Sequence, residues 1–257
     1  SKLHLLTVTK SIFMTRKSLF FRASISFLLF VALTCFQLRA LAESDAPVVI
    51  ELFTSQGCYS CPPADKLLGE LKDVGNLIVL ACHVTYWNYL GWQDTFSRQF
   101  CDDRQRNYQA QLIGNPGVYT PQVVVSGRYG AVGSRASRVK RLISLANTNT
   151  PARRIKLSIA NDGQLKIELP DTQASQVHRL WLLGTSGSHL LPIVKGENGG
   201  KALNYHNPIE YVADLGSWTG HLKTLSKDVT ENSNIQEWVV IAQTHPLGGI
   251  AAAGKLT

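Results

Sequence analysis

The sequence has 257 residues, of which 44% are hydrophobic and 17% are charged, and its 26 Lys and Arg outnumber its 18 Asp and Glu for a net charge of +8. A chain of this length can bury a sizeable core, and the composition is neither that of a disordered protein nor that of a collagen. A mean hydropathy near zero argues against a protein with many membrane-spanning helices. The positive charge suggests nucleic acid or an acidic membrane as a partner, so its position along the chain matters.

The first 42 residues have the composition of a targeting segment. They hold six Lys and Arg and no Asp or Glu, and an uncharged apolar run precedes the sequence Ala-Leu-Ala at 40–42. This order predicts a secretory signal peptide over residues 1–42, because the run is too short to span a bilayer comfortably. Translation is expected to begin at Met14. The alternatives are an uncleaved membrane anchor and a lipoprotein modified at Cys35.

Removing this segment changes the charge argument. Six of the 26 Lys and Arg leave with it, so 20 basic residues face 18 acidic ones in the remaining chain. Because these charges are spread evenly, we expect no nucleic-acid partner. We also expect no stable membrane span once the signal is removed, and no cofactor. The protein is predicted to be periplasmic or secreted, and such compartments permit disulfides.

Hydrophobic patterning predicts alternating strands and helices over residues 43–149. The β-branched, apolar run at 48–54 is typical of a buried strand, and the prolines at 62–63 suit the first turn of a helix. Further along this stretch we expect strands at 77–84 and 122–127, and helices over 95–111 and 138–145.

The character of the sequence changes after the polar segment 147–151. Short β-rich runs follow one another with turn signals between them and without an intervening helical pattern. Residues 150–257 are therefore predicted to be a small antiparallel β-sandwich. The expected fold class is α+β overall, with an α/β domain over 43–149 followed by this sandwich.

Cys58 and Cys61 form a C-x-x-C motif between the first predicted strand and the first predicted helix. A helix N-terminus presents free N–H groups and the positive end of its dipole, which stabilise a thiolate. This arrangement predicts a thioredoxin-like α/β domain in which Cys58 is an exposed nucleophile and Cys61 resolves the mixed disulfide. The alternative is half of a structural zinc site, but the sequence has no second C-x-x-C and no H-x-x-H.

Thr120-Pro121 directly precedes the third predicted strand. In thioredoxin-like folds a proline at this place is cis and lies opposite the C-x-x-C, so Pro121 is predicted to be cis and Thr120 to position a substrate backbone. The alternative is an ordinary proline at a sheet edge. Four flanking residues are candidates for substrate contact, with packing as their alternative role: Tyr59, Ser60, Tyr119 and Trp87.

Several longer strings around these motifs carry a family resemblance. They are residues 51–65, 83–94, 104–105, 118–122, 196–207 and 218–220. Over nearly the whole of residues 43–257 the chain resembles the secreted thioredoxin-like proteins grouped as domain of unknown function 1223. The resemblance implies a thioredoxin-like domain plus a β-sandwich, and it assigns no reaction.

Four positions depart from the family pattern. Thr85 and Asn88 stand where aspartates are usual, which puts a carboxylate role of that segment in doubt. Cys82 and Cys101 are additions, one on a predicted strand and one on the following helix. We expect a structural disulfide between them, with two buried free thiols as the alternative.

Two further polar residues carry predictions. Thioredoxin-like enzymes often keep a buried acid on the strand before the C-x-x-C, so Glu51 is a candidate proton acceptor, or else a satisfied polar residue at the strand edge. His83 is expected to be a packed, hydrogen-bonded residue. Cys58, Cys61 and His83 are also the soft ligands that would suit a copper site.

The functional hypothesis is an exported thiol–disulfide oxidoreductase that uses the Cys58–Cys61 pair. Its partners would be a protein or small-molecule thiol or disulfide and a redox partner, and the sequence leaves the direction of the reaction open. Two alternatives stand beside it. One is a periplasmic copper-binding or metallochaperone protein, and the other is a non-catalytic binding scaffold with a permanent disulfide.

Overall fold

The computed structural model describes residues 46–112, 117–172, 176–244 and 248–257. The predicted signal peptide, with Met14 and Cys35, lies outside the described residues. Within the described ranges, no helix is long and apolar enough to cross a membrane.

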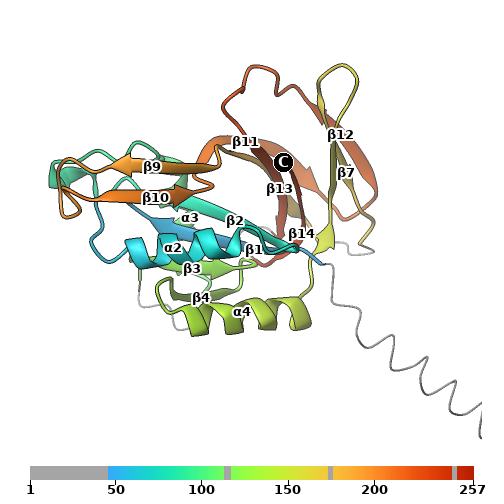
Figure 1. The fold of residues 1–257 in the computed structure, drawn as a ribbon. Helices are drawn as coiled ribbons and strands as arrows, with labels where there is room; N and C mark the ends of the chain where they lie inside the picture. Colours follow the sequence, from blue (N-terminus) through green and yellow to red (C-terminus); the bar gives the residue numbers. More distant parts are fainter. Residues whose placement is uncertain (1–45, 113–116, 173–175, 245–247) are drawn as a thin grey trace, which may run out of the picture. The chain divides into compact units, whose positions relative to one another are not determined.

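A four-stranded sheet and three α-helices make up the first part of the described chain (Figure 1). The strand order is β2-β1-β3-β4, in which β1 runs parallel to β2 and antiparallel to β3. The strands are β1 (Val48–Thr54), β2 (Leu77–His83), β3 (Gln122–Val125) and β4 (Tyr129–Val132). The helices are α2 (Pro62–Leu71), α3 (Gln99–Gln109) and α4 (Ala136–Asn149), with the short 3-10 helix η1 (Asn88–Leu90) before α3.

Strand β1 is buried along its whole length. A continuous apolar run is typical of a strand with both faces covered, and here the two faces have different neighbours. Ile50 and Leu52 pack with residues of α2 and α4. Val49 and Phe53 pack with Tyr108 of α3 and with residues of the later strands. Because β1 ends at Thr54, the cysteine motif follows shortly after the carboxyl end of this central strand.

Two sheets of the second part face each other across a shared core. One sheet has the order β11-β8-β13-β14-β5 and the other the order β12-β7-β6. The strands of the larger sheet are β5 (Arg153–Arg154), β8 (His178–Thr185), β11 (Ile209–Trp218), β13 (Glu237–Thr244) and β14 (Ile250–Leu256). The smaller sheet consists of β6 (Lys156–Ile159), β7 (Leu165–Leu169) and β12 (Lys223–Lys227).

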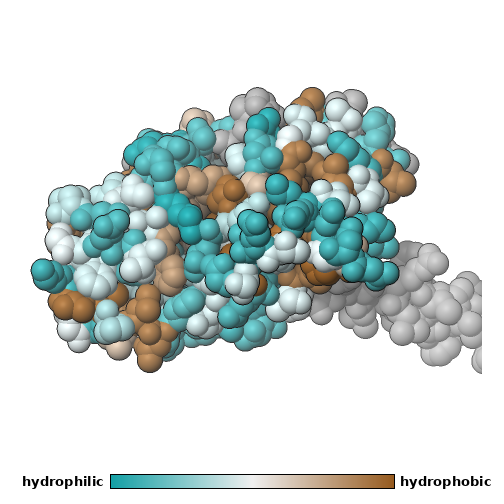
Figure 2. Space-filling view, turned by 90° about the horizontal axis from the view of Figure 1, so that it is seen from above, coloured by the Kyte–Doolittle hydropathy of each residue, from teal (hydrophilic) through white to brown (hydrophobic). Residues whose placement is uncertain are grey.

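The hairpin of β9 (Ser188–Pro192) and β10 (Ala202–His206) forms a separate two-stranded sheet that lies beside α2 (Figure 1). Its outer residues Leu190 and Val194 are 64% and 68% exposed. Seen from above, the surface of the protein mixes hydrophobic residues in brown with hydrophilic ones in teal (Figure 2). The loop between β9 and β10 runs toward the start of α2, which brings it to the cysteine motif.

The structure has the mixed α/β character that the sequence predicts. The predicted strands and helices of residues 43–149 are present, with ends that differ by a few residues, and α4 ends at Asn149. One detail of the predicted antiparallel arrangement is wrong, because β5 pairs in parallel with β14. The division into two domains at 149/150 stays a prediction.

A disulfide joins Cys82 at the end of β2 to Cys101 in the first turn of α3. This is the pairing that we expect from the sequence. Both cysteines are buried, and their side chains belong to the core between the first sheet and the second part of the chain. The disulfide therefore holds α3 against the sheet across 19 positions of sequence.

Replacing both residues in the variant C82A/C101A should lower the free energy of unfolding by about 3 kcal/mol, because the cross-link restricts the unfolded chain. Urea denaturation of the oxidised proteins measures the difference. In strong reductant, which reduces Cys82–Cys101 once the chain unfolds, the wild type should fall to the stability of the equally reduced variant. An unchanged free energy of unfolding in the oxidised variant would contradict a structural role.

Candidate functional site

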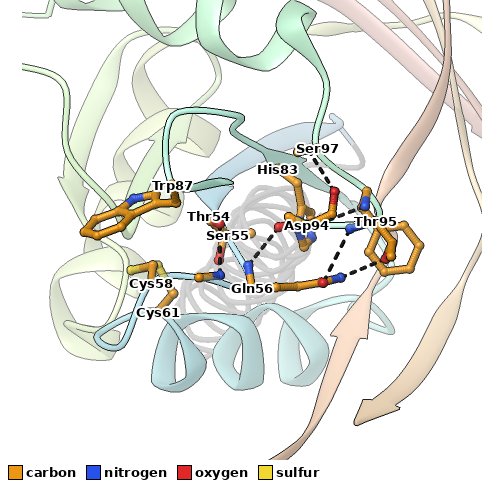
Figure 3. Close-up of polar contacts among 12 residues, drawn as sticks. Thr54, Ser55, Gln56, Cys58, Cys61, His83, Trp87, Asp94, Thr95 and Ser97 are labelled. Atoms are coloured by element: carbon orange, nitrogen blue, oxygen red, sulfur yellow. Dashed lines mark hydrogen bonds and ion pairs between the residues drawn. A yellow bond between two sulfur atoms is a disulfide. The ribbon is translucent and has the colours of Figure 1, made fainter. Parts of the chain in front are cut away.

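The Cys58–Cys61 disulfide lies at the start of α2 (Figure 3). Cys61 is the N-cap residue of the helix, and the two prolines that follow occupy its first positions, where a missing N–H costs little. The motif therefore connects the buried end of β1 to a helix N-terminus. This is the placement that the sequence predicts.

A chain of hydrogen bonds leads to the sulfur of Cys58. The indole Nε1 of Trp87 donates to Thr120 Oγ1 at 2.8 Å, and the Thr120 hydroxyl donates to Cys58 Sγ at 3.2 Å. Because Trp87 already donates to the oxygen, the hydroxyl proton is free to point at the sulfur. The Thr120–Pro121 bond is cis, the geometry that the sequence predicts.

Both cysteines are buried, and Cys58 is only 1% exposed. This corrects the expectation of an exposed nucleophile. The segment between β9 and β10, here called the cap segment (residues 196–201), is hydrogen-bonded to the backbone around Cys58. Asn198 is fully buried and donates from Nδ2 to the carbonyl oxygens of Gln56 at 3.0 Å and Cys58 at 2.9 Å.

A group of buried polar side chains lies next to the motif, on the side of α2 and β2 (Figure 3). Thr54 donates to Asp65 Oδ1 at 2.8 Å. Asp94 Oδ2 accepts from the backbone N–H of Gln56 and lies 2.7 Å from Nδ1 of His83. No sequence motif marks Asp65 or Asp94, although both stand in the strings that carry the family resemblance.

Two of these residues, His83 and Asp94, form an ion pair, and the third, Asp65, is an acid with a raised pKa. Burial alone would lower the pKa of His83, but the carboxylate of Asp94 outweighs burial and raises it. Burial alone would raise the pKa of Asp94, and its bond to His83 lowers it instead. Burial raises the pKa of Asp65 to about 7, and the charge of His83 offsets only part of that effect. Asp65 therefore changes its protonation near neutral pH.

Glu51 does not lie among these residues. Arg104 donates to both of its carboxylate oxygens, and the Tyr108 hydroxyl donates to Oε2 at 2.6 Å. Strand alternation explains this place, because Glu51 shares the face of β1 with Val49 and Phe53, toward α3, whereas Thr54 contacts α2. Within the described residues its hydrogen bonds thus match a satisfied polar residue, in the middle of β1 and not at the strand edge, and they leave its role as proton acceptor without support.

The four flanking candidates surround the motif in different ways. Tyr59 is 67% exposed, and Ser60 lies with its hydroxyl 3.5 Å from Cys58 Sγ. Trp87 reaches the site through Thr120, as described above. Tyr119 contributes its backbone carbonyl, which accepts from Gln105 Nε2 at 2.7 Å and so anchors the segment before Pro121.

The geometry gives the copper alternative no support. His83 points toward Asp94 and away from the cysteines (Figure 3). In the ranges that the structure describes, no group of three or more His, Cys, Asp or Glu side chains is placed to hold a metal ion.

A family of proteins described as "Protein of unknown function (DUF1223)" matches residues 49–243. The chain belongs to this family. No curated protein matches it. The matched range contains every residue of the site described above, including the cap segment.

Solved structures that resemble this DUF1223 protein include the following two. Protein AGR_C_4864 from Agrobacterium tumefaciens, known from its X-ray crystal structure, is 27% identical with a TM-score of 0.71, and the match covers 81% of this chain and 93% of that chain. HBP35 of Porphyromonas gingivalis is 13% identical with a TM-score of 0.57, over 82% of this chain and 74% of that one. The second likeness concerns the fold alone.

The raised pKa of Asp65 makes the stability of this DUF1223 protein depend on pH. The folded protein binds a proton at Asp65 more tightly than the unfolded chain does, so this residue stabilises the fold most below pH 4 and loses that contribution up to about pH 7. The variant D65N keeps an acceptor for Thr54 and lacks the titration. Between pH 4 and pH 7 its free energy of unfolding should therefore rise relative to wild type, by on the order of 1–4 kcal/mol.

Urea denaturation across that pH range measures the difference. The control is D73N, which replaces the carboxylate of a side chain that is 84% exposed. A D65N curve that stays parallel to wild type would show that Asp65 is not a buried acid that titrates near neutral pH.

Proposed function

We propose that this protein is an exported thiol–disulfide oxidoreductase with a thioredoxin-like domain over residues 43–149 and a β-sandwich domain over 150–257. Its reactive group is the Cys58–Cys61 pair. The two disulfides of the described chain suit a periplasmic or secreted protein, since such bonds persist in oxidising compartments.

One observation carries the proposal, namely the hydroxyl of Thr120 directed at Cys58 Sγ. In the reduced protein this donor would stabilise a thiolate at Cys58, and hydrogen bonds to a charged group contribute about 1.5–3 kcal/mol. The start of α2 adds the positive end of its helix dipole, while its N–H groups do not contribute, because Pro62 and Pro63 lack one and those of Ala64 and Asp65 donate to the Cys61 carbonyl. A disulfide with only a structural role needs neither contribution.

The reaction is thiol–disulfide exchange in two steps. The Cys58 thiolate attacks one sulfur of a substrate disulfide, which forms a mixed disulfide and releases one substrate thiolate. The Cys61 thiolate then attacks Cys58 Sγ, which forms the Cys58–Cys61 disulfide and releases the second substrate thiolate. Two electrons pass from the protein to the substrate, and the reverse sequence oxidises a substrate dithiol.

Asp65 is placed to handle the proton of Cys61. It lies four residues after Cys61, one turn along the same helix, and its Oδ2 is buried without a hydrogen-bond partner among the described residues. It also lines a pocket of about 320 Å³ between α2 and β10, which gives a route for exchange with solvent. An acid with a pKa of about 7 both accepts and returns a proton at neutral pH. In this proposal Asp65 takes the role that the sequence suggested for Glu51.

A second candidate function is the non-catalytic scaffold. The observation that favours it is the burial of both cysteines, since a shielded disulfide resists attack. The two functions differ in a measurable property. A scaffold keeps its disulfide under strong reductant in the folded state, and an oxidoreductase does not.

The test uses the reduced protein and an aromatic disulfide reagent whose released thiolate is coloured. Wild type should release two thiolates per chain and retain none. The variant C61S should release one and keep the other half of the reagent on Cys58, and C58S should react far more slowly. Replacing the hydroxyl donor in T120V should slow the first step about tenfold.

The matched control is T120S, which keeps the hydroxyl and should react at nearly the wild-type rate. Mass spectrometry locates the retained group in C61S. A Cys58–Cys61 pair that cannot be reduced without unfolding would overturn the proposal and favour the scaffold.

A further inference from the structure

Hydrogen bonds hold the cap segment in place, both at its base and at the cysteine motif. Its ends are closed by two backbone hydrogen bonds, from Ile193 N–H to the Lys201 carbonyl at 2.8 Å and from Gly200 N–H to the Ile193 carbonyl at 2.7 Å. Ile193 itself is buried, so the loop is anchored at its base. At its tip, Asn198 holds the carbonyls of Gln56 and Cys58.

Local geometry fixes the approach of this loop to the aromatic segment. Gly196 has a φ of +78°, and a Cβ added there would lie 3.3 Å from the Cβ of Trp92. Trp92 in turn donates from Nε1 to Gln56 Oε1 at 2.8 Å. A glycine is therefore required where the cap segment meets Trp92. The position of the following residue, Glu197, is a consequence of this close approach.

The carboxylate of Glu197 accepts a hydrogen bond from the backbone N–H of Tyr59 at 3.1 Å. Tyr59 directly follows Cys58, so the chain itself keeps the Tyr59 amide close to the Cys58 side chain, where an N–H donor would favour a thiolate. A carboxylate at this amide takes up the donor and adds a negative charge in the neighbourhood of the sulfur. Both effects disfavour the thiolate.

An opposite charge comes from the other end of the same segment. Lys201 Nζ donates to Asn198 Oδ1 at 2.9 Å and lies 4.4 Å from the centre of the Tyr59 ring. Its positive charge favours a thiolate at Cys58. The cap segment thus brings one acidic and one basic side chain to the residue next to the nucleophile.

We propose that Glu197 is a positioning residue that holds the Tyr59 amide and weakens the Cys58 thiolate, and that Lys201 opposes it. The cap segment then sets the acidity of the nucleophilic thiol from a part of the chain more than 130 residues away, as the separation of 138 positions between Tyr59 and Glu197 shows. This inference rests on the proposed function, because it requires a Cys58 thiol that forms reversibly.

The experiment measures the rate of alkylation of Cys58 by iodoacetamide as a function of pH in the reduced, folded protein. In E197Q the midpoint of this profile, which is the pKa of the Cys58 thiol, should fall by about half a unit, since a partly exposed charge near the sulfur acts through a high effective dielectric. In K201Q it should rise by a similar amount. Both shifts should shrink in 1 M salt, which screens exposed charges.

The matched control is E231Q, which neutralises an exposed glutamate of the loop before β13 and should leave the profile unchanged. Opposite shifts in E197Q and K201Q support the inference, and equal profiles in all four proteins overturn it while leaving the proposed function intact. Shifts in the same direction would assign both residues a merely structural role and also overturn it. If Cys58 cannot be reduced in the folded protein, the proposed function fails first, and the inference fails with it.

Discussion

Strand β1 is buried on both faces, and this constraint organises the rest of the protein. Helices α2 and α4 cover one face, and α3 together with residues of β8, β13 and β14 covers the other. A strand in this position has no access to water, so each polar side chain on it needs a partner within the protein. Glu51 accepts hydrogen bonds from Arg104 and Tyr108, and Thr54 donates one to Asp65.

The same constraint decides where chemistry is possible. The cysteine motif begins where β1 ends, and its surroundings come from several distant segments of the chain. Thr120 approaches from the segment before β3, Asp94 from the segment before α3, and Asn198 from the loop between β9 and β10. The second part of the chain is thus more than a cover for the first sheet, because one of its loops completes the environment of Cys58.

Local sequence patterns predict much of this arrangement. The apolar run of β1, the cysteine motif at a helix start and the proline before β3 each depend on a few neighbouring residues, and the structure places them as expected. The pairing of Cys82 with Cys101 can also be predicted, because a strand and the following helix are usually neighbours in space.

What the sequence did not predict depends on register and on distant contacts. The partners of Glu51 depend on which face of β1 its side chain occupies, and a register shift of one residue would move the side chain to the opposite face. The role of Asp65 depends on its burial against Thr54, and the hydrogen bond to the Cys58 carbonyl comes from Asn198, which is 140 positions further along the chain. No spacing within a motif contains that information. Asn198 stands in a string that carries the family resemblance, yet only the fold shows what its amide holds.

The most direct test of the central claim is an equilibrium titration of the folded protein with a dithiol reductant, in which free thiols are alkylated and the peptides are weighed by mass spectrometry. The account predicts one reversible two-electron step at Cys58–Cys61, while Cys82–Cys101 stays oxidised in the core. Reduction of both disulfides together, only as the protein unfolds, would contradict it.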